Sequence, residues 1–138
     1  MERIYCILIG YAFGLFQTAF ILGKIKGIDI RKHGSGNSGT TNTLRTLGIK
    51  AAAVTFLGDL LKAIIPVIIV KFAFAGIWDG DMEVVEIYAG FGAVLGHNFP
   101  FYLKFKGGKA LPALQVSFLP FVPWRLRFAL CFLWGLWQ

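Results

Sequence analysis

Cysteine, acidic residues and charge in general are scarce in this chain. Only two of its 138 residues are cysteines, Cys6 and Cys131, which are too few for a disulfide framework or a zinc cluster. Charged residues make up 15% of the chain and hydrophobic residues 57%, before the 17 glycines are counted. Disordered chains have low hydrophobicity, and soluble domains are about 45–50% apolar with glycine included, so both classes are excluded. The net charge of +7 lies on so apolar a chain that nucleic-acid binding is a poor explanation for it.

Long uncharged runs are what the chain has instead. Residues 4–23 carry no charged side chain, and about 20 helical residues match a hydrocarbon core of roughly 30 Å. A signal peptide is the alternative, but Glu2 and Arg3 cancel where a basic region is required, and a basic segment follows the run. Further apolar runs cover residues 51–75, 84–103 and 113–137. The sequence therefore predicts an all-α, polytopic membrane helix bundle of about four spans.

Basic residues are distributed unevenly between these runs. The segment between the first two runs carries six Lys or Arg and one acid, and the segment between the last two carries three Lys and no acid. The segment 76–84 carries three acids and no basic residue. Because Lys and Arg accumulate in cytoplasmic loops, we expect both basic segments in the cytoplasm and the N-terminus outside.

The first basic segment contains a glycine-rich loop. Gly34, Gly36 and Gly39 match the pattern GxGxxG, but no βαβ unit fits between two membrane spans, so a dinucleotide site is excluded. Glycines still let the backbone approach an anion, and successive N–H groups form a nest for oxyanions. Neutral polar side chains and one guanidinium accompany them: Ser35, Asn37, Thr40, Thr41, Asn42 and Arg45. The loop predicts a phosphate site, with a flexible linker as the alternative.

The second basic segment repeats this chemistry with lysines. A stretch from Gly96 to Pro100 precedes Lys104, Lys106, Gly107, Gly108 and Lys109, without the spacing of a Walker A loop. A basic cluster that contacts lipid headgroups is the alternative. Since both glycine-rich loops are expected on one face of the membrane, we expect them to surround one phosphate-bearing ligand.

Two ionisable features lie within or beside the spans. Asp59 and Lys62 are three residues apart and share a helical face, so they form either a functional pair or a structural pair that neutralises itself. His97 is either a general base or phosphate ligand, or a satisfied interfacial histidine. No nucleophile triad and no metal-ligand spacing is present in the sequence. These features suit acyl or alkyl transfer onto a phosphorylated alcohol, and a transporter is the alternative.

The motifs, in this order, resemble the bacterial PlsY-type glycerol-3-phosphate acyltransferases over about residues 1–109. The resemblance rests on residues 34–48, 58–66 and 96–109. It implies an inner-membrane enzyme that transfers a fatty acyl group from acyl phosphate to the 1-hydroxyl of glycerol 3-phosphate, giving lysophosphatidic acid and phosphate for phospholipid biosynthesis. It also implies no cofactor, no metal and no covalent acyl-enzyme, and a partner enzyme that makes the acyl phosphate.

The loop chemistry and the resemblance together select the candidate site residues. Catalytic roles are expected for Ser35, Arg45 and His97. Substrate and phosphate binding is expected for Gly36, Asn37, Gly39, Thr41, Asn42, Lys104, Lys106, Gly107, Gly108 and Lys109, with Asp59 and Lys62 in support. Acyl phosphate is already activated, so positioning and charge stabilisation suffice for catalysis.

Residues 110–138 depart from the family pattern. The family is expected to have about seven spans and a third motif rich in His, Asn, Arg and Glu, which this chain lacks. The segment 110–138 holds one of the 17 glycines, no acid and three of the four tryptophans. We therefore expect a family-like core at 1–109 and an atypical hydrophobic tail at 110–138, which a shift of reading frame in the gene would explain. The alternative function is a small phosphate-ester transporter or an inactive fragment of the acyltransferase.

Overall fold

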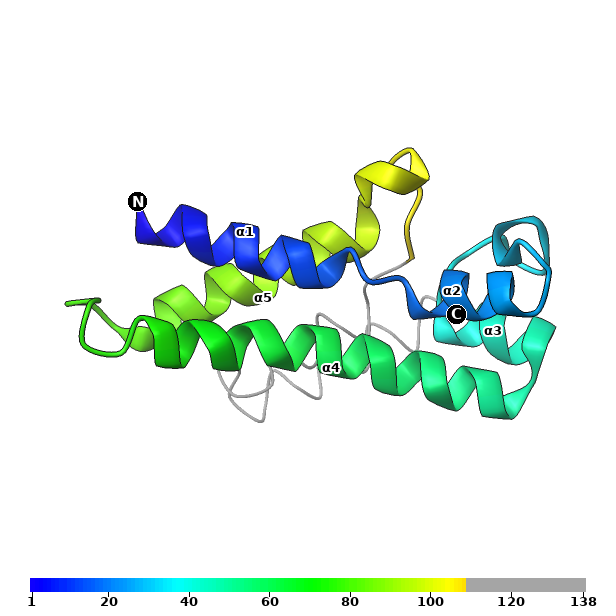
Figure 1. Cartoon of the computed structure of the whole chain (residues 1–138), viewed down its shortest axis with the longest axis horizontal. Helices are drawn as coiled ribbons and strands as arrows, with labels where there is room; N and C mark the ends of the chain where they lie inside the picture. The colour runs from blue at the N-terminus through cyan, green and yellow to red at the C-terminus, as the bar shows by residue number, and fades with distance from the viewer. Residues whose placement is uncertain (109–138) are drawn as a thin grey trace, which may run out of the picture.

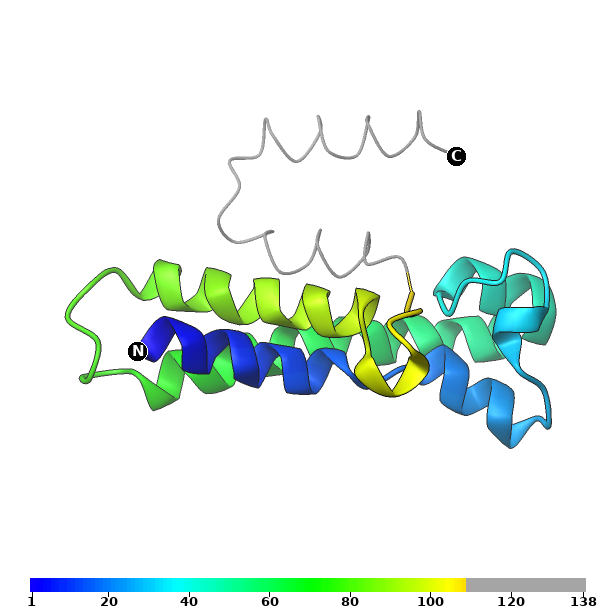
Figure 2. The same ribbon diagram turned by 90° about the horizontal axis from the view of Figure 1, so that it is seen from above.

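The computed structural model describes residues 1–108, and within them the chain is helical, with no strand. The elements are α1 (Glu2–Gly14), α2 (Thr18–Ile25), η1 (Ile30–Lys32), α3 (Thr40–Leu47), α4 (Ile49–Ala73), α5 (Met82–Asn98) and η2 (Phe101–Leu103), where η is a short 3₁₀ turn. Helices α1, α4 and α5 lie along one another, and α2 and α3 gather at one end (Figure 1, Figure 2). The all-α prediction is confirmed for this part, and the span predicted at 113–137 lies outside the described residues.

The first predicted span is broken in the middle. Helix α1 ends at Gly14 and α2 begins at Thr18, with the intervening Gln17 at φ −101° and ψ 85°. The carbonyl of Leu15 accepts a hydrogen bond from the Tyr102 hydroxyl (2.5 Å), and the carbonyl of Phe16 accepts one from Lys62 Nζ (2.8 Å). A broken helix is tolerated at membrane depth where protein groups satisfy the freed backbone. The apolar run alone did not predict the break, since both partners lie far along the chain.

The third predicted span, 84–103, extends past the C-terminal end of the observed helix. Helix α5 stops at Asn98, and Phe99 leaves the helical region at φ −125° and ψ 56°. The cause is Pro100, because the residue before a proline is disfavoured in the helical conformation. The chain then turns through η2, and this turn carries the second basic loop to the end of the bundle where α2 lies.

Helices α1 and α5 cross with their backbones in contact. A side chain at Gly10 would run into the carbonyl of Ala89, and one at Gly92 would run into the carbonyl of Ile7. Gly14 and Gly96 extend the same contact by one turn, so each helix carries a glycine pair at GxxxG spacing. Small residues at this spacing let membrane helices approach closely. The crossing places the C-terminal end of α5 against the break between α1 and α2.

The outer surface is apolar and part of the interior carries ionisable side chains, the inverse of a soluble fold. Large apolar side chains on α1 and α4, among them Leu8, Phe56, Leu61 and Phe72, are about half exposed or more. Two stretches are long and apolar enough to cross a membrane, Glu2–Ile25 and Ile49–Ala73, with mean hydropathy 1.8 and 2.1. Helix α5 follows them with 17 residues. These helices occupy the first three predicted spans.

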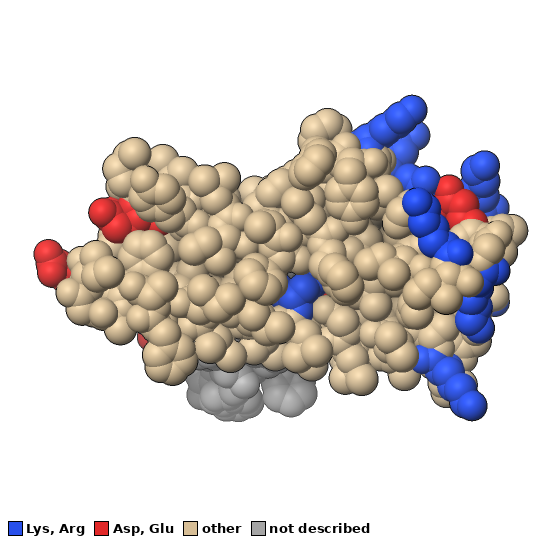
Figure 3. Space-filling model, viewed as in Figure 1, with Lys and Arg blue, Asp and Glu red and all other residues tan. Residues whose placement is uncertain are grey.

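Charge is separated along the long axis of the molecule. In the face shown in Figure 3, acidic residues lie at the end that holds the α4–α5 connection, and basic residues cluster around an acidic group at the end that holds α2 and α3. Between them the surface is almost free of charge, apart from one basic group at the bottom of a hollow. An uncharged band between charged ends is the arrangement expected of a bundle that crosses a bilayer.

Candidate active site

The glycine-rich loop is folded around the side chain of Asn42, in the first turn of α3. The Asn42 amide oxygen accepts from the N–H of Ser35 (2.9 Å), and its nitrogen donates to the carbonyls of Ile30 (3.1 Å) and His33 (3.0 Å). A side chain at Gly34, where φ is +57°, would run into the Asn42 amide oxygen. Asn42 is buried and holds the shape of the loop through these three bonds.

The other candidates in this loop lie in different environments. Ser35, Thr41 and Arg45 are exposed, and Gly39 is the buried N-cap of α3. The Asn37 side-chain nitrogen lies 3.1 Å from the point that a Cβ atom would occupy at Gly39. No strand precedes the loop within residues 1–108, consistent with the exclusion of a dinucleotide site. The sequence did not predict this division between buried and exposed loop positions.

The second loop closes back onto the end of α5. The N–H groups of Gly107 and Gly108 donate to the carbonyls of Asn98 and His97, both at 3.1 Å. A side chain at Gly108 would run into the imidazole of His97, and it would approach the carbonyl of Ser38 to 3.1 Å. The two glycine-rich loops therefore lie next to each other at Gly108. Lys109 lies outside the described residues.

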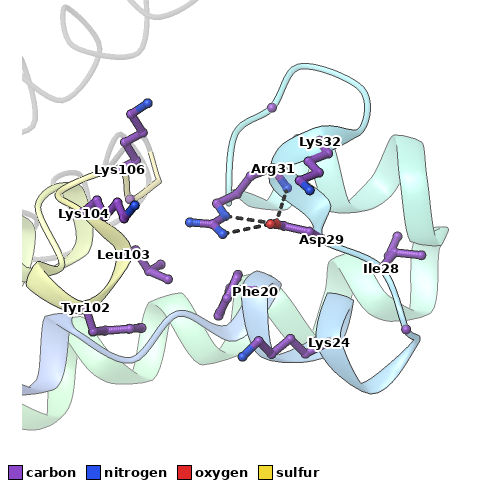
Figure 4. A pocket seen from close by; sticks show the side chains of 13 residues that line it. Phe20, Lys24, Ile28, Asp29, Arg31, Lys32, Tyr102, Leu103, Lys104 and Lys106 are labelled. Atoms are coloured by element: carbon purple, nitrogen blue, oxygen red, sulfur yellow. Dashed lines mark hydrogen bonds and ion pairs between the residues drawn. The ribbon is translucent and has the colours of Figure 1, made fainter.

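A pocket of about 870 Å³ opens where α2, η1 and η2 meet (Figure 4). Five of its lining side chains are cationic and one is a carboxylate, Asp29; the cations are Lys24, Arg31, Lys32, Lys104 and Lys106. Gly36 and Gly107 supply backbone to its wall. Among the predicted phosphate-binding residues, Gly36, Lys104, Lys106 and Gly107 line this pocket, whereas Asn37, Gly39, Thr41, Asn42 and Gly108 do not. The predicted catalytic residues Ser35, Arg45 and His97 do not line it either. The charge of the pocket fits an anion with more than one negative charge.

Sequence reasoning missed the cations that come from the first segment. Lys24, Arg31 and Lys32 counted only toward orientation, although they line the pocket together with the ring of Phe20. The ring lies beneath Arg31, whose guanidinium carbon is 4.8 Å from the ring centroid. The available signal was the Asp29-x-Arg31 spacing beside the glycines, which allows a carboxylate to hold a guanidinium at the edge of the loop.

Asp29 orients Arg31 through a two-pronged ion pair, drawn in Figure 4. Arg31 Nε lies 2.9 Å from Asp29 Oδ1, and Arg31 Nη2 lies 2.8 Å from Asp29 Oδ2. The backbone N–H of Arg31 also donates to Oδ1 at 3.1 Å. The side-chain hydrogen bonds from Arg31 are the main reason that the pKa of Asp29 falls to about 2, and the same bonds raise the pKa of Arg31.

This ion pair is expected to make the free energy of unfolding depend on pH in the acid range. The pKa of Asp29 is about 2 in the folded chain and ordinarily 3.8, so the folded state binds fewer protons between these values. The contribution is complete above about pH 5 and is lost progressively as the pH falls toward 1. We expect the difference in the free energy of unfolding between wild type and Asp29→Asn, measured in detergent, to shrink over that window. A difference that stays constant down to pH 2 would contradict this assignment.

Asp59 and Lys62 of α4 and His97 of α5 form a buried polar cluster. Lys62 Nζ lies 2.7 Å from Asp59 Oδ1, 2.6 Å from His97 Nδ1 and 2.8 Å from the Phe16 carbonyl. The side chains of Lys62, Asp59 and His97 are 3%, 7% and 2% exposed. The Gln17 side chain adds a bond to the His97 carbonyl at 2.8 Å. Asp59 and Lys62 share a face and form an ion pair, one of the two arrangements that their spacing predicted, and His97 joins them.

Comparison with known proteins places this architecture in a family. The family model described as "Glycerol-3-phosphate acyltransferase" matches residues 4–137. The glycerol-3-phosphate acyltransferase of Alkaliphilus metalliredigens is 48% identical over 112 residues, which cover 80% of this chain and 54% of that protein. The Bacillus subtilis protein of the same name is 46% identical over 106 residues, 76% of this chain and 51% of that protein. The chain thus spans about half the length of these curated relatives.

Solved structures agree with the sequence comparison. The crystal structure of PlsY, an integral membrane glycerol 3-phosphate acyltransferase, in its glycerol 3-phosphate form matches with a TM-score of 0.71 and 35% identity over 85% of this chain and 56% of that one. The lysophosphatidic acid form matches with a TM-score of 0.69. The resemblance based on the loop motifs is confirmed, as is the membrane helix-bundle fold. The chain belongs to the glycerol-3-phosphate acyltransferase family, among the PlsY-type integral membrane proteins.

Proposed function

We propose that this chain carries a phosphate-ester site of an enzyme that transfers a fatty acyl group from acyl phosphate to the 1-hydroxyl of glycerol 3-phosphate. The observation that carries the proposal is the pocket of five cations and one carboxylate where the two glycine-rich loops converge. Lysophosphatidic acid and inorganic phosphate are the products. The names and bound forms of the relatives support glycerol 3-phosphate as the acceptor and lysophosphatidic acid as the product, since the solved PlsY structures are a glycerol 3-phosphate form and a lysophosphatidic acid form.

The chemistry needs little from the protein beyond placement and charge. The glycerol hydroxyl oxygen forms a bond to the acyl carbonyl carbon, the carbonyl–phosphate C–O bond breaks, and the hydroxyl proton leaves with the phosphate. Cations that hold phosphate groups stabilise the charge that develops in this step. Ser35, Arg45 and His97 remain the predicted catalytic residues. Neither a metal nor a covalent acyl-enzyme is required by this route.

An apolar hollow gives a place for the acyl chain. It has a volume of about 470 Å³ between α1 and α4 and is lined by Ala12, Phe13, Phe16, Gly58, Leu61, Lys62 and Ile65. Its walls are almost entirely apolar, and the one cation in its lining is Lys62. A groove of this kind on a membrane-facing surface fits a hydrocarbon chain that arrives through lipid. An enzyme that synthesises acyl phosphate is the proposed partner.

We propose a multi-pass location in a bacterial inner membrane, with both basic loops in the cytoplasm and the N-terminus outside. The separation of charge in Figure 3 supports this orientation, because the anion pocket lies at the basic end. The division into a core at 1–109 and a tail at 110–138 remains a prediction, and the tail lies outside the described residues.

Removing lysines from the pocket is the test of this function. In membranes that contain the chain, Lys104→Gln/Lys106→Gln is expected to raise the KM for glycerol 3-phosphate by about tenfold, because charge-assisted bonds to phosphate contribute roughly 1.5–3 kcal/mol when shielded and less at exposed side chains. Lysophosphatidic acid and phosphate release are measured together. Lys26→Gln/Lys50→Gln removes the same charge from exposed residues outside the pocket and is expected to leave the KM unchanged.

Two results would overturn the proposal. Equal effects of both lysine pairs would mean that the pocket acts only through net charge. Uptake or binding of glycerol 3-phosphate by the purified chain without any acyl transfer would favour the phosphate-ester transporter or inactive fragment instead.

A further inference from the structure

Three polar groups surround the amine of Lys62, and one of them is the ring of His97. An ammonium group has three N–H donors and no acceptor. The Asp59 carboxylate, the Phe16 carbonyl and the Nδ1 atom of His97 lie 2.6–2.8 Å from Lys62 Nζ, so each N–H has one partner. When Lys62 is the ammonium partner of Asp59, it donates in all three contacts, and Nδ1 of His97 is then the acceptor. A neutral imidazole that accepts at Nδ1 carries its proton on Nε2.

The other side of the imidazole lies against the second loop. A side chain placed on Gly108 would run into Nε2 and Cε1 of His97, so the ring is packed directly against this glycine. The backbone of His97 is fixed as well, because its carbonyl accepts from Gln17 and from the N–H of Gly108. The next residue back in the turn, Gly107, lines the anion pocket. A change in the ring orientation of His97 is therefore transmitted to the pocket wall over one residue.

We infer that Lys62 is a positioning residue: it fixes His97 as the Nε2–H tautomer and, through the ring, holds the Gly107–Gly108 turn against the anion pocket. Lys62 belongs to α4, which contributes no residue to the lining of that pocket. Its ammonium links α4 to the α1–α2 break and to the end of α5, and the Lys62 side chain is only 3% exposed. Orientation of a histidine by a partner on its other nitrogen is a general device for setting the tautomer.

The Nε2–H tautomer limits what His97 can do in the reaction, and here the inference rests on the proposed function. The only lone-pair nitrogen of the imidazole is already engaged by Lys62, so His97 does not take the proton of the glycerol hydroxyl. Its contribution is placement of the turn and an N–H directed toward the loops. Of the two roles predicted for a functional His97, the structure thus favours a hydrogen-bond donor over a general base.

The tautomer is measurable without any enzyme assay. His33 and His97 are the two histidines of the chain, and His33 is exposed, so His33→Gln leaves a single imidazole. In detergent micelles at pH 7.5, ¹⁵N-histidine spectra are expected to place the proton on Nε2 and an unprotonated nitrogen at Nδ1. A proton on Nδ1, or rapid exchange between both tautomers, would overturn the inference, whatever the activity of the chain.

A variant without the buried charges supplies the second measurement. Asp59→Leu/Lys62→Met removes the donor and its counter-ion together. We expect the tautomer preference to be lost and the Kd for glycerol 3-phosphate to rise by about tenfold, while Leu57→Met on the exposed face of α4 changes neither. Circular dichroism and size-exclusion chromatography are the controls that test whether both variants remain folded.

The outcomes separate this inference from the proposed function. An unchanged tautomer in the folded pair variant, or an unchanged Kd, would remove Lys62 from the positioning role. If the wild-type chain binds no glycerol 3-phosphate at all, the proposed function fails, and the wild-type spectrum still decides whether Lys62 fixes the tautomer.

Discussion

Gly10→Leu is expected to abolish the folded state of the bundle. A side chain at this position would enter the carbonyl group of Ala89, and it would approach the backbone nitrogen of Ala93 to 2.9 Å. Backbone atoms in the middle of α5 cannot move aside as a flexible side chain can. The helices would have to separate along the whole GxxxG crossing, at a cost of about 3 kcal/mol or more. We expect loss of the monodisperse peak in detergent and of the thermal unfolding transition.

Ala12→Leu is the matched control on the same helix. Ala12 is exposed and lines the apolar hollow between α1 and α4, so the added side chain enters open space and not the backbone of α5. Its unfolding temperature is expected to stay close to that of the wild type. Similar behaviour of both variants would mean that α1 and α5 do not touch through their glycines.

Lys62→Met is expected to destabilise the chain more than the removal of Lys62 and Asp59 together. The single change leaves a buried carboxylate without its cation, and breaking a buried ion pair from one side costs about 3–5 kcal/mol. Asp59→Leu/Lys62→Met removes the carboxylate and the ammonium together, so neither buried charge is left without its counter-ion. We therefore expect the second substitution to restore ~2 kcal/mol.

Unfolding by denaturant in mixed micelles measures this double-mutant cycle. The diagnostic result is its sign, because adding Asp59→Leu to the Lys62→Met chain should raise stability, whereas most second substitutions in a buried site lower it. A pair variant less stable than Lys62→Met would show that Asp59 contributes independently of the ammonium.

Local features of the sequence predicted the parts of the structure that depend on local geometry. The apolar runs located the three described spans, and the spacing of Asp59 and Lys62 predicted their shared face. The end of α5 at Asn98 also has a local cause, because Pro100 disfavours the helical conformation of Phe99. The end of the predicted span 84–103 was therefore predictable from the sequence around Pro100. Each of these features depends on residues within one helix or one turn.

Features that depend on distant partners could not be predicted in this way. The break after α1 is stabilised by Lys62 and Tyr102, and a run of apolar residues contains no signal for either bond. Asn42 illustrates a second limit, because an amide beside glycines can bind a substrate or the loop backbone with the same chemistry. Arg31 illustrates a third, since a basic residue near a span satisfies the positive-inside rule whether or not it lines a pocket.

The break between α1 and α2 also constrains the order of events during synthesis of the chain. Its two freed carbonyls are satisfied by side chains that lie 46 and 87 residues away, in segments translated later. Until those segments reach the bilayer, a continuous helix is the state of residues 2–25 that leaves no carbonyl unsatisfied in lipid. The nascent chain is therefore expected to enter the membrane with a straight first helix, which bends only after α4 and η2 have followed it.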